Sequence, residues 1–283
     1  MYYLLLVLLY PISLLPLQVL YLLSDLFYII VYHLVGYRKA IVMDNLQHAF
    51  PQKTEQELLA IRKEFYRNFC DQWIETIKLL SISQKELNKR VTGNWEVFHQ
   101  VDAKEKNTYA LLGHTFNWEW ANVVCQYNVA QQFVGFYMPA TSEAFDKLMI
   151  KARTRSGAWL ISMKAKKAMQ RLEGVRYIVG LVADQNPSAL QHAVWLNFMN
   201  RETAFFNGPE KLARRAKAAV VFAGINKVKR GYYNIHLHLL TEDASHTENG
   251  FVMQQYVQFM VQQLHSQPAN WLWTHKRWKH KRS

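Results

Sequence analysis

The feature that most constrains the fold is an alternation, beyond residue 108, of short apolar runs with stretches of helical periodicity. The runs of strand length are 109–112, 133–138, 158–163, 177–183, 194–198, 220–225 and 232–240, and the helical patterns fall near 118–127, 142–155, 164–173, 207–218 and 247–265. Strands that alternate with helices are typical of a sheet layered with helices. The sequence therefore predicts an α/β fold with a mixed central sheet flanked by helices.

Two helix-start signals precede this alternation. Thr54 and Glu57 have the spacing of a capping box, and Ser83 and Glu86 repeat it. After the first signal, apolar side chains recur near the helical period, which predicts a long helix with an aromatic stripe that packs in the core or on a membrane. No internal repeat or low-complexity linker is visible, so residues 38–283 are expected to form one domain.

Residues 1–37 differ in composition from the rest of the chain. Asp25 is the only charged side chain before Arg38, and the apolar run exceeds the roughly 20 residues that cross a hydrocarbon layer. Pro11 and Pro16 are expected to kink it. We therefore predict a membrane anchor over residues 1–37. Three arrangements stay open: a spanning helix, a helix that lies in one leaflet, or a buried helix of a soluble domain.

Local charge and cysteine content indicate a compartment. Arg38 and Lys39 follow the apolar segment directly, so the positive-inside rule places the remainder of the chain in the cytoplasm. A cleaved signal peptide is not expected, because no basic region precedes the apolar run and no small-residue cleavage site follows it. Only Cys70 and Cys125 occur, which predicts no disulfide framework and agrees with a reducing compartment.

The formal net charge of +13 predicts an acidic partner. No Asp or Glu occurs from Asn249 to Ser283, and the chain closes on WLWTHKRWKHKRS, where Trp271, Trp273 and Trp278 interleave with basic residues. Such a surface suits nucleic acid, an anionic membrane surface, or an acidic protein or phosphorylated substrate. The apolar amino terminus favours the membrane, and a merely solvated tail is the plain alternative.

The stretch GHTFNWE, residues 113–119, is the best candidate for chemistry. An imidazole at His114 and a carboxylate at Glu119 can act as a general base and the acid that orients it. Five residues along one helix would point the two side chains apart, so they meet only if His114 lies in a turn and Glu119 in the first turn of the next helix. Asn117 is the expected N-cap of that helix. The same spacing recurs at His238, where we interpret it as the polar face of a strand.

Other polar groups cluster where α/β sheets place their sites. His114 and Asp184 each follow an apolar run, and sites gather beyond the carboxyl ends of strands. Gln185 follows Asp184, although a turn-forming aspartate is the plain alternative there. Arg153 and Arg155 end a predicted helix and could hold an anion, or simply favour a helix C-terminus. No phosphate loop, dinucleotide fingerprint, nucleophile elbow or metal-spaced cluster occurs, so no cofactor and no metal are expected.

These blocks together resemble one family. The chain is similar to the bacterial lipid A biosynthesis late acyltransferases of the lauroyl/myristoyl type, within the glycerolipid acyltransferase group marked by His-x4-Asp/Glu. The resemblance covers nearly the whole chain and rests on the apolar amino terminus, GHTFNWE, ARTRS, VADQN, FMNRETAFFNGPEKLA and WLWTHKRWK. Glu119 stands where many relatives have Asp. The Glu-Gly-Thr-Arg block of the glycerolipid branch is missing, which favours the lipid A branch.

The resemblance implies transfer of an acyl chain from acyl carrier protein to a hydroxyl of a lipid A precursor. It implies an enzyme on the cytoplasmic side of the bacterial inner membrane, with His114 as general base and Glu119 as its orienting acid. The residues then expected to bind substrate are Arg155, Asp184, Gln185, Arg153 and Asn117. Three alternatives remain: a lysophospholipid or amino-acid lipid as the acceptor, a membrane-tethered nucleic-acid-binding protein, or an inactive scaffold that keeps the fold. We expect membrane as a partner and no nucleic acid.

Overall fold

A seven-stranded sheet forms the centre of the molecule. The computed structural model describes residues 1–165, 168–187, 189–280 and 282. The strand order is β1-β9-β8-β2-β5-β3-β4, and all neighbours are parallel except β8 and β9. The strands are β1 (Val91–Gly93), β2 (Thr108–Leu112), β3 (Gln132–Tyr137), β4 (Trp159–Ser162), β5 (Tyr177–Val182), β8 (Ala219–Lys229) and β9 (Tyr232–Thr241). The predicted mixed α/β fold is confirmed.

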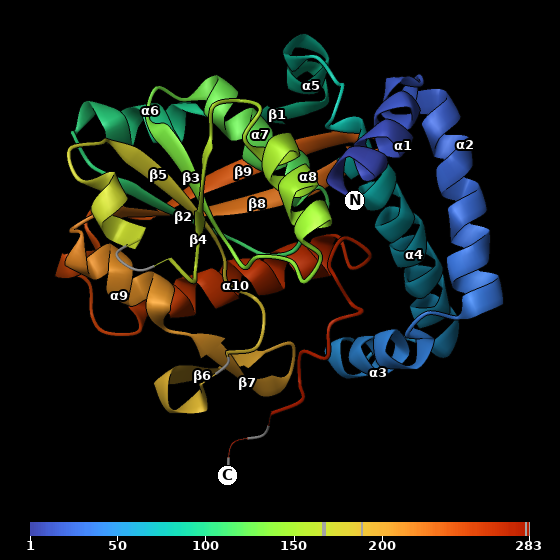
Figure 1. The fold of residues 1–283 in the computed structure, drawn as a ribbon. Coiled ribbons are helices and arrows are strands. Elements are labelled where there is room, and N and C mark those ends of the chain that lie inside the picture. The colour runs from blue at the N-terminus through green and yellow to red at the C-terminus, as the bar shows by residue number, and fades with distance from the viewer. Residues whose placement is uncertain (166–167, 188, 281, 283) are drawn as a thin grey trace.

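Helices cover both faces of this sheet. Figure 1 shows α9 and α10 on one face and α6 and α7 on the other. The helices of this part are α3 (Lys39–Ala49), α4 (Glu55–Lys78), α5 (Gln84–Arg90), α6 (Glu96–Ala103), α7 (Trp118–Asn128), α8 (Glu143–Arg153), α9 (Gly208–Arg215) and α10 (Phe251–Ser266). The predicted capping box at Thr54 and Glu57 starts α4, and the hydroxyl of Ser83 caps α5. His238 lies on β9, as its strand interpretation requires.

Each of the seven predicted apolar runs overlaps a strand, but two details differ from the prediction. Run 194–198 is β6 (Ala193–Phe198), which leaves the main sheet and forms a hairpin with β7 (Arg201–Phe206). The turn residues Met199 and Asn200 both have positive φ, the geometry of a tight hairpin turn. The predicted helix 164–173 contains only a short 3-10 helix, Ala168–Leu172, and its residues 166–167 lie outside the described part.

The apolar amino-terminal segment forms two helices. These are α1 (Tyr2–Leu14) and α2 (Leu17–Tyr28), and a π-helical turn (Ile29–Val35) continues α2. Pro16 separates them because a proline disfavours helical backbone at the residue before it, and Leu15 is extended there. Pro11 stays inside α1. The continuous helix of 19 residues from Leu17 to Val35 is long and apolar enough to cross a membrane, by length and composition.

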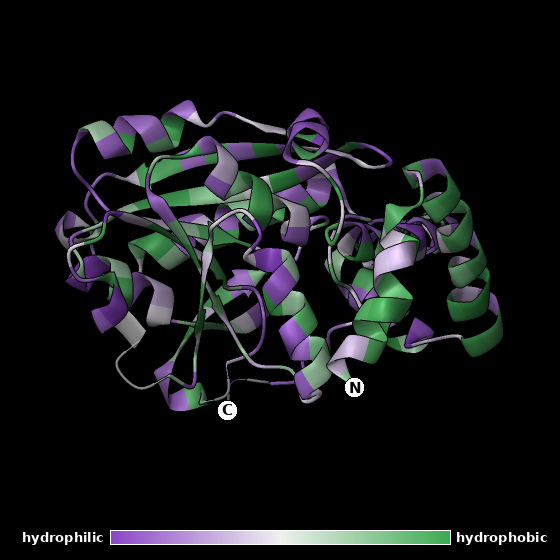
Figure 2. Cartoon of the chain, turned by 45° about the horizontal axis from the view of Figure 1, so that its top comes forward, coloured by the Kyte–Doolittle hydropathy of each residue, from purple (hydrophilic) through white to green (hydrophobic). Residues whose placement is uncertain are grey.

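Helix α2 lies alongside α4 (Figure 1). Its inner face buries Leu17, Leu20 and Tyr28 against the protein. Its outer face exposes apolar side chains that no described residue covers, and hydrophobic residues occupy most of α1 and α2 in Figure 2. Across α1, α2 and the π-helical turn, the large apolar side chains that are more than half exposed are Tyr3, Leu4, Val7, Leu8, Leu14, Leu22, Leu26, Leu34 and Val35. An apolar patch of this extent marks a surface that binds a partner or a membrane.

Candidate active site

Two neighbouring strands bring the main polar groups together. β2 and β5 pair in parallel, with Leu112 opposite Val182, so their carboxyl ends meet at the same edge of the sheet. The backbone amide of Ala183 extends the pairing by donating to the carbonyl of Leu112, at 3.1 Å. His114 and Asp184 come directly after these ends. Residues 70 positions apart in sequence therefore become neighbours.

Asp184 holds the imidazole of His114. Its Oδ1 lies 2.6 Å from Nδ1 of the ring, and its Oδ2 accepts from the backbone amide of His114 at 2.8 Å and from the indole of Trp271 at 2.6 Å. Burial alone would raise the pKa of Asp184, but the charge of the ring and these hydrogen bonds outweigh it and lower the pKa to about 2. Asp184 is therefore ionised at neutral pH and accepts every nearby donor.

This contact determines which ring nitrogen of His114 is free. An ionised Asp184 can only accept, so Nδ1 carries the proton and donates to it. In the neutral ring Nε2 then keeps its lone pair, and the side-chain amide nitrogen of Gln185 lies 3.2 Å from it. The edge of the ring meets Trp118 at a centroid distance of 5.2 Å. A histidine in this tautomer, next to a fixed anion, can take a proton from a hydroxyl.

Glu119 does not orient this ring, so that part of the prediction is wrong. Its two carboxylate oxygens accept from Nε and Nη2 of Arg153, at 2.7 and 2.6 Å, and Oε1 also accepts from the indole of Trp118 at 3.0 Å. Glu119 is buried in the first turn of α7, and Arg153 at the end of α8 supplies the charge that a buried carboxylate needs. The sequence spacing placed Glu119 correctly on its helix but gave it the wrong partner.

The other predicted site residues divide into two groups. Arg153 and Gln185 line the same cavity as His114. Arg155 instead donates to the backbone carbonyl of Leu79, at the end of α4, and does not line that cavity. Asn117 is the predicted N-cap of α7, its buried side chain is engaged there and it does not line the cavity, so its contact with substrate stays a prediction.

The carboxyl-terminal segment forms hydrogen bonds with the loop of His114 and with Asp184. Besides the indole of Trp271, the amide of Leu272 donates to the carbonyl of His114 at 3.2 Å. The side-chain oxygen of Asn270 accepts from the amide of Phe116 at 3.1 Å. The loop that carries His114 is therefore fixed on both sides of the ring. Sequence reasoning missed this role, although the apolar composition of NWLW was a usable signal.

The prediction of an interleaved tryptophan and basic surface is accordingly wrong for Trp271, Trp273 and Arg277. Trp271 and Trp273 are buried, and so is Arg277, whose guanidinium lies 4.4 Å from the ring of Phe205 and donates to the carbonyl of Ala204. Stacking on nucleic-acid bases needs exposed aromatic rings. The buried rings of Trp271 and Trp273 cannot supply it.

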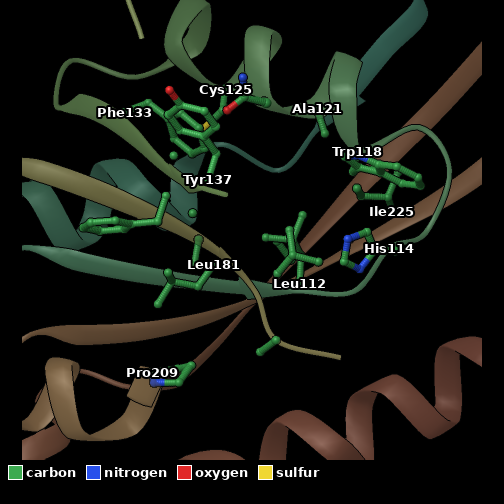
Figure 3. Close-up of a pocket in the computed structure, with 18 of the residues that line it drawn as sticks. Leu112, His114, Trp118, Ala121, Cys125, Phe133, Tyr137, Leu181, Pro209 and Ile225 are labelled. Atoms are coloured by element: carbon green, nitrogen blue, oxygen red, sulfur yellow. The ribbon is translucent and has the colours of Figure 1, made fainter. Parts of the chain in front are cut away.

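A cavity of about 830 Å³ opens at His114. Its polar mouth contains His114, Trp118, Glu119, Arg153, Gln185 and Asn186, and Figure 3 shows His114 and Trp118 side by side there. The remaining lining is mostly apolar and includes Ala110, Leu112, Ala121, Cys125, Phe133, Gly180, Leu181, Ile225, Ile235 and Leu237. The cavity therefore fits a long apolar group with its reactive end at the histidine.

Two glycines keep room for this cavity and for the histidine loop. A Cβ on Gly180 would lie 2.7 Å from the ring of Phe133, inside the cavity lining. A Cβ on Gly113 would lie 2.4 Å from the side chain of Met260 on α10 and 3.3 Å from Asp184. Close approach of the backbone to its neighbours explains glycine at both positions.

A histidine held by a buried carboxylate beside an apolar cavity has the geometry of a general base for a hydroxyl, with room for a long apolar group. In the part of the chain that the structure describes, no group of three His, Cys, Asp or Glu side chains is placed to hold a metal ion. The family model for bacterial lipid A biosynthesis acyltransferase matches residues 1–280, and the chain belongs to that family. A comparison with curated proteins finds no match. The family makes the protein an acyltransferase of lipid A biosynthesis, with a lipid A-type substrate.

Proposed function

We propose that the protein transfers a fatty acyl chain from the thioester of acyl carrier protein to a hydroxyl of a lipid A precursor. The observation that carries this proposal is the His114–Asp184 pair at the mouth of the apolar cavity. The catalytic domain, residues 38–283, works on the cytoplasmic side of the inner membrane, and residues 1–37 attach it there. The apolar outer face of α1 and α2 supports this attachment, because exposed apolar side chains of a helix bury into the lipid interface.

In the proposed reaction, Nε2 of His114 takes the proton of the acceptor hydroxyl, which replaces the amide of Gln185 next to the ring. The hydroxyl oxygen forms a bond to the acyl carbon, and the carbon–sulfur bond of the thioester breaks. The imidazolium then returns its proton to the sulfur that leaves. Ionised Asp184 stabilises the imidazolium and keeps Nδ1 protonated throughout. Direct transfer of this kind needs no acyl-enzyme.

Arg153 is the proposed stabiliser of the thioester oxygen as its negative charge develops. Glu119 uses Nε and Nη2 of Arg153, and within the described residues Nη1 has no hydrogen-bond partner. Arg153 lines the mouth of the cavity together with His114. A fixed cation at the place where charge develops lowers the barrier without reorganisation. Glu119 thus has a positioning role in this proposal, because it holds the guanidinium.

The substrates fit the remaining features. The acyl chain occupies the apolar cavity, where each buried methylene contributes about 0.8 kcal/mol. Acyl carrier protein is acidic, and the chain has a formal net charge of +13, so complementary charge would guide the two proteins together. The same positive charge suits the phosphates of a lipid A precursor.

A direct test compares acyl transfer from labelled acyl carrier protein to a lipid A precursor by wild type, His114→Ala and His236→Ala. His236 is exposed on β9, distant in sequence from the site, and serves as the matched control. We expect His114→Ala to lose roughly 10²–10⁴-fold in rate, the usual contribution of a general base, while His236→Ala keeps the wild-type rate. Wild-type turnover by folded His114→Ala would contradict the mechanism. Acylation of a lysophospholipid in preference to the lipid A precursor would contradict the proposed acceptor.

A further inference from the structure

A carboxyl group that the proposed reaction does not use lies at the centre of a buried network. Glu75, on α4, is fully buried and does not line the cavity. Its Oε1 accepts from the hydroxyl of Tyr21 at 2.8 Å. Its Oε2 accepts from the side-chain amide of Asn117 at 2.7 Å and from the hydroxyl of Tyr233 at 2.8 Å. Burying a carboxyl group is costly, and these three donors compensate it.

One end of this network is the start of α7. The side-chain oxygen of Asn117 accepts from the amide of Trp120 at 3.0 Å and caps the helix. The backbone carbonyl of Glu75 also accepts from the indole of Trp120, at 2.8 Å. Glu75 therefore fixes the first turn of α7 at two points. His114 lies three residues before Asn117, and Glu119 lies two residues after it, so both ends of the proposed site adjoin the cap.

The other end of the network is the apolar helix α2. Tyr21 belongs to α2, and Arg230 donates to its backbone carbonyl at 3.2 Å. The same guanidinium binds Asp25 of α2 and Asp71 of α4, each at 2.7 Å. Gly231 has a positive φ, and a Cβ there would lie 2.1 Å from the hydroxyl of Tyr21. The position of α2 relative to α4 is thus defined close to the point where Tyr21 reaches Glu75.

We propose that Glu75 is a positioning residue for acyl transfer, through which α2 holds the amino-terminal cap of α7 and so the groups at the mouth of the cavity. The inference rests on the proposed function. It assigns to the lipid-facing helix a second role besides attachment, because Tyr21 extends from that helix to the cap. Loss of the link leaves the cavity and the His114–Asp184 contact in place but lets the first turn of α7 move, together with Glu119.

The test uses full-length Tyr21→Phe, which removes one hydroxyl, and Glu75→Gln, which replaces one carboxyl oxygen by an NH2 donor, both with little change in the size of the side chain. Tyr28→Phe is the matched control, because Tyr28 is also buried on α2 and its hydroxyl has no hydrogen-bond partner among the described residues. We expect kcat of both test variants to fall about 10- to 100-fold, the loss typical of a small misplacement of reacting groups. The KM for acyl carrier protein should stay at its wild-type value. Tyr28→Phe should match wild type in both constants.

Hydrogen exchange of peptides from the first turn of α7 gives a readout that does not depend on the reaction. We expect faster exchange of the Trp120 amide in Tyr21→Phe and Glu75→Gln than in Tyr28→Phe. Wild-type kcat and wild-type exchange in both test variants would overturn the inference, even if His114→Ala is inactive and the proposed function stands. Faster exchange together with an active His114→Ala would instead leave the link intact and reject the proposed function.

Discussion

Replacing Asp184 by asparagine tests the charge of the site directly. The indole of Trp271 and the amide of His114 both point at Oδ2, so the amide oxygen of an asparagine would face them. Its NH2 group would then face Nδ1 of His114. Because NH2 is a donor, Nδ1 must lose its proton in order to accept this hydrogen bond. The proton moves to Nε2, and the ring can no longer act as a base. We expect Asp184→Asn to lose roughly 10²–10⁴-fold in the rate of acyl transfer.

The same substitution has a stability effect with a defined pH dependence. A fall in the pKa of Asp184 from 3.8 to about 2 corresponds to about 2 kcal/mol, at about 1.4 kcal/mol for each pH unit. Because the pKa is lower in the folded state, this stabilisation is present above about pH 4 and is lost as the pH falls toward 2.

Urea unfolding of wild type and Asp184→Asn at several pH values measures this effect. The difference in unfolding free energy should be greatest at pH 7 and smaller by about half at pH 3. Asp44→Asn is the control, because the carboxyl of Asp44 is exposed. A difference for Asp184→Asn that does not change between pH 7 and pH 3 would refute the assignment of an ionised, strongly hydrogen-bonded carboxylate. A wild-type rate of acyl transfer would refute the tautomer argument.

The lining of the cavity and its support give two further predictions. Gly180→Val places methyl groups against Phe133 inside the cavity, so competition between acyl donors of different length should shift toward shorter chains, and an unchanged preference would mean that the chain lies elsewhere. Trp271→Phe removes a hydrogen bond to an ionised Asp184, which contributes about 1.5–3 kcal/mol, so kcat should fall by about tenfold or more. Trp278→Phe, which keeps an aromatic ring and loses a hydrogen bond to Thr203 but none to Asp184, should keep the wild-type kcat.

Periodicity was sufficient to predict the architecture, because hydrophobic alternation is a local signal. All seven predicted runs became strands, and the N-caps at Thr54, Ser83 and Asn117 formed as their spacing required. The separate hairpin of β6 and β7 was not predicted, since the pairing of a strand with one sheet or another depends on contacts distant in sequence. Its turn, at Met199 and Asn200, lacks the glycine that usually marks such a turn.

The site was predicted in part. His114 and Asp184 were both recognised as residues that follow strands, but their contact depends on β2 and β5 being neighbours, which no local pattern specifies. Glu119 was close in sequence and was therefore chosen as the partner of the ring. The actual partner of Glu119, Arg153, was recognised only as a possible anion binder, because its approach depends on the packing of α8 against α7.

The tail shows why composition alone misleads. Tryptophan among basic residues is equally typical of an exposed binding surface and of a buried segment whose cationic side chains donate to backbone carbonyls. Arg277 is of the buried kind: its guanidinium lies against the ring of Phe205 and donates to the backbone carbonyl of Ala204 and the side-chain oxygen of Asn186. Only the three-dimensional surroundings distinguish the two.

The hydrogen bond from Trp271 to Asp184 comes from one of the last parts of the chain to be synthesised. His114 and Asp184 leave the ribosome long before Trp271, and domains fold progressively as they emerge. Before residues 271 and 272 are synthesised, Asp184 lacks the indole donor of Trp271, and the carbonyl of His114 lacks the backbone donor of Leu272. A chain that ends before residue 271 would still expose its apolar amino-terminal helices but would lack the hydrogen bond that Trp271 gives to Asp184.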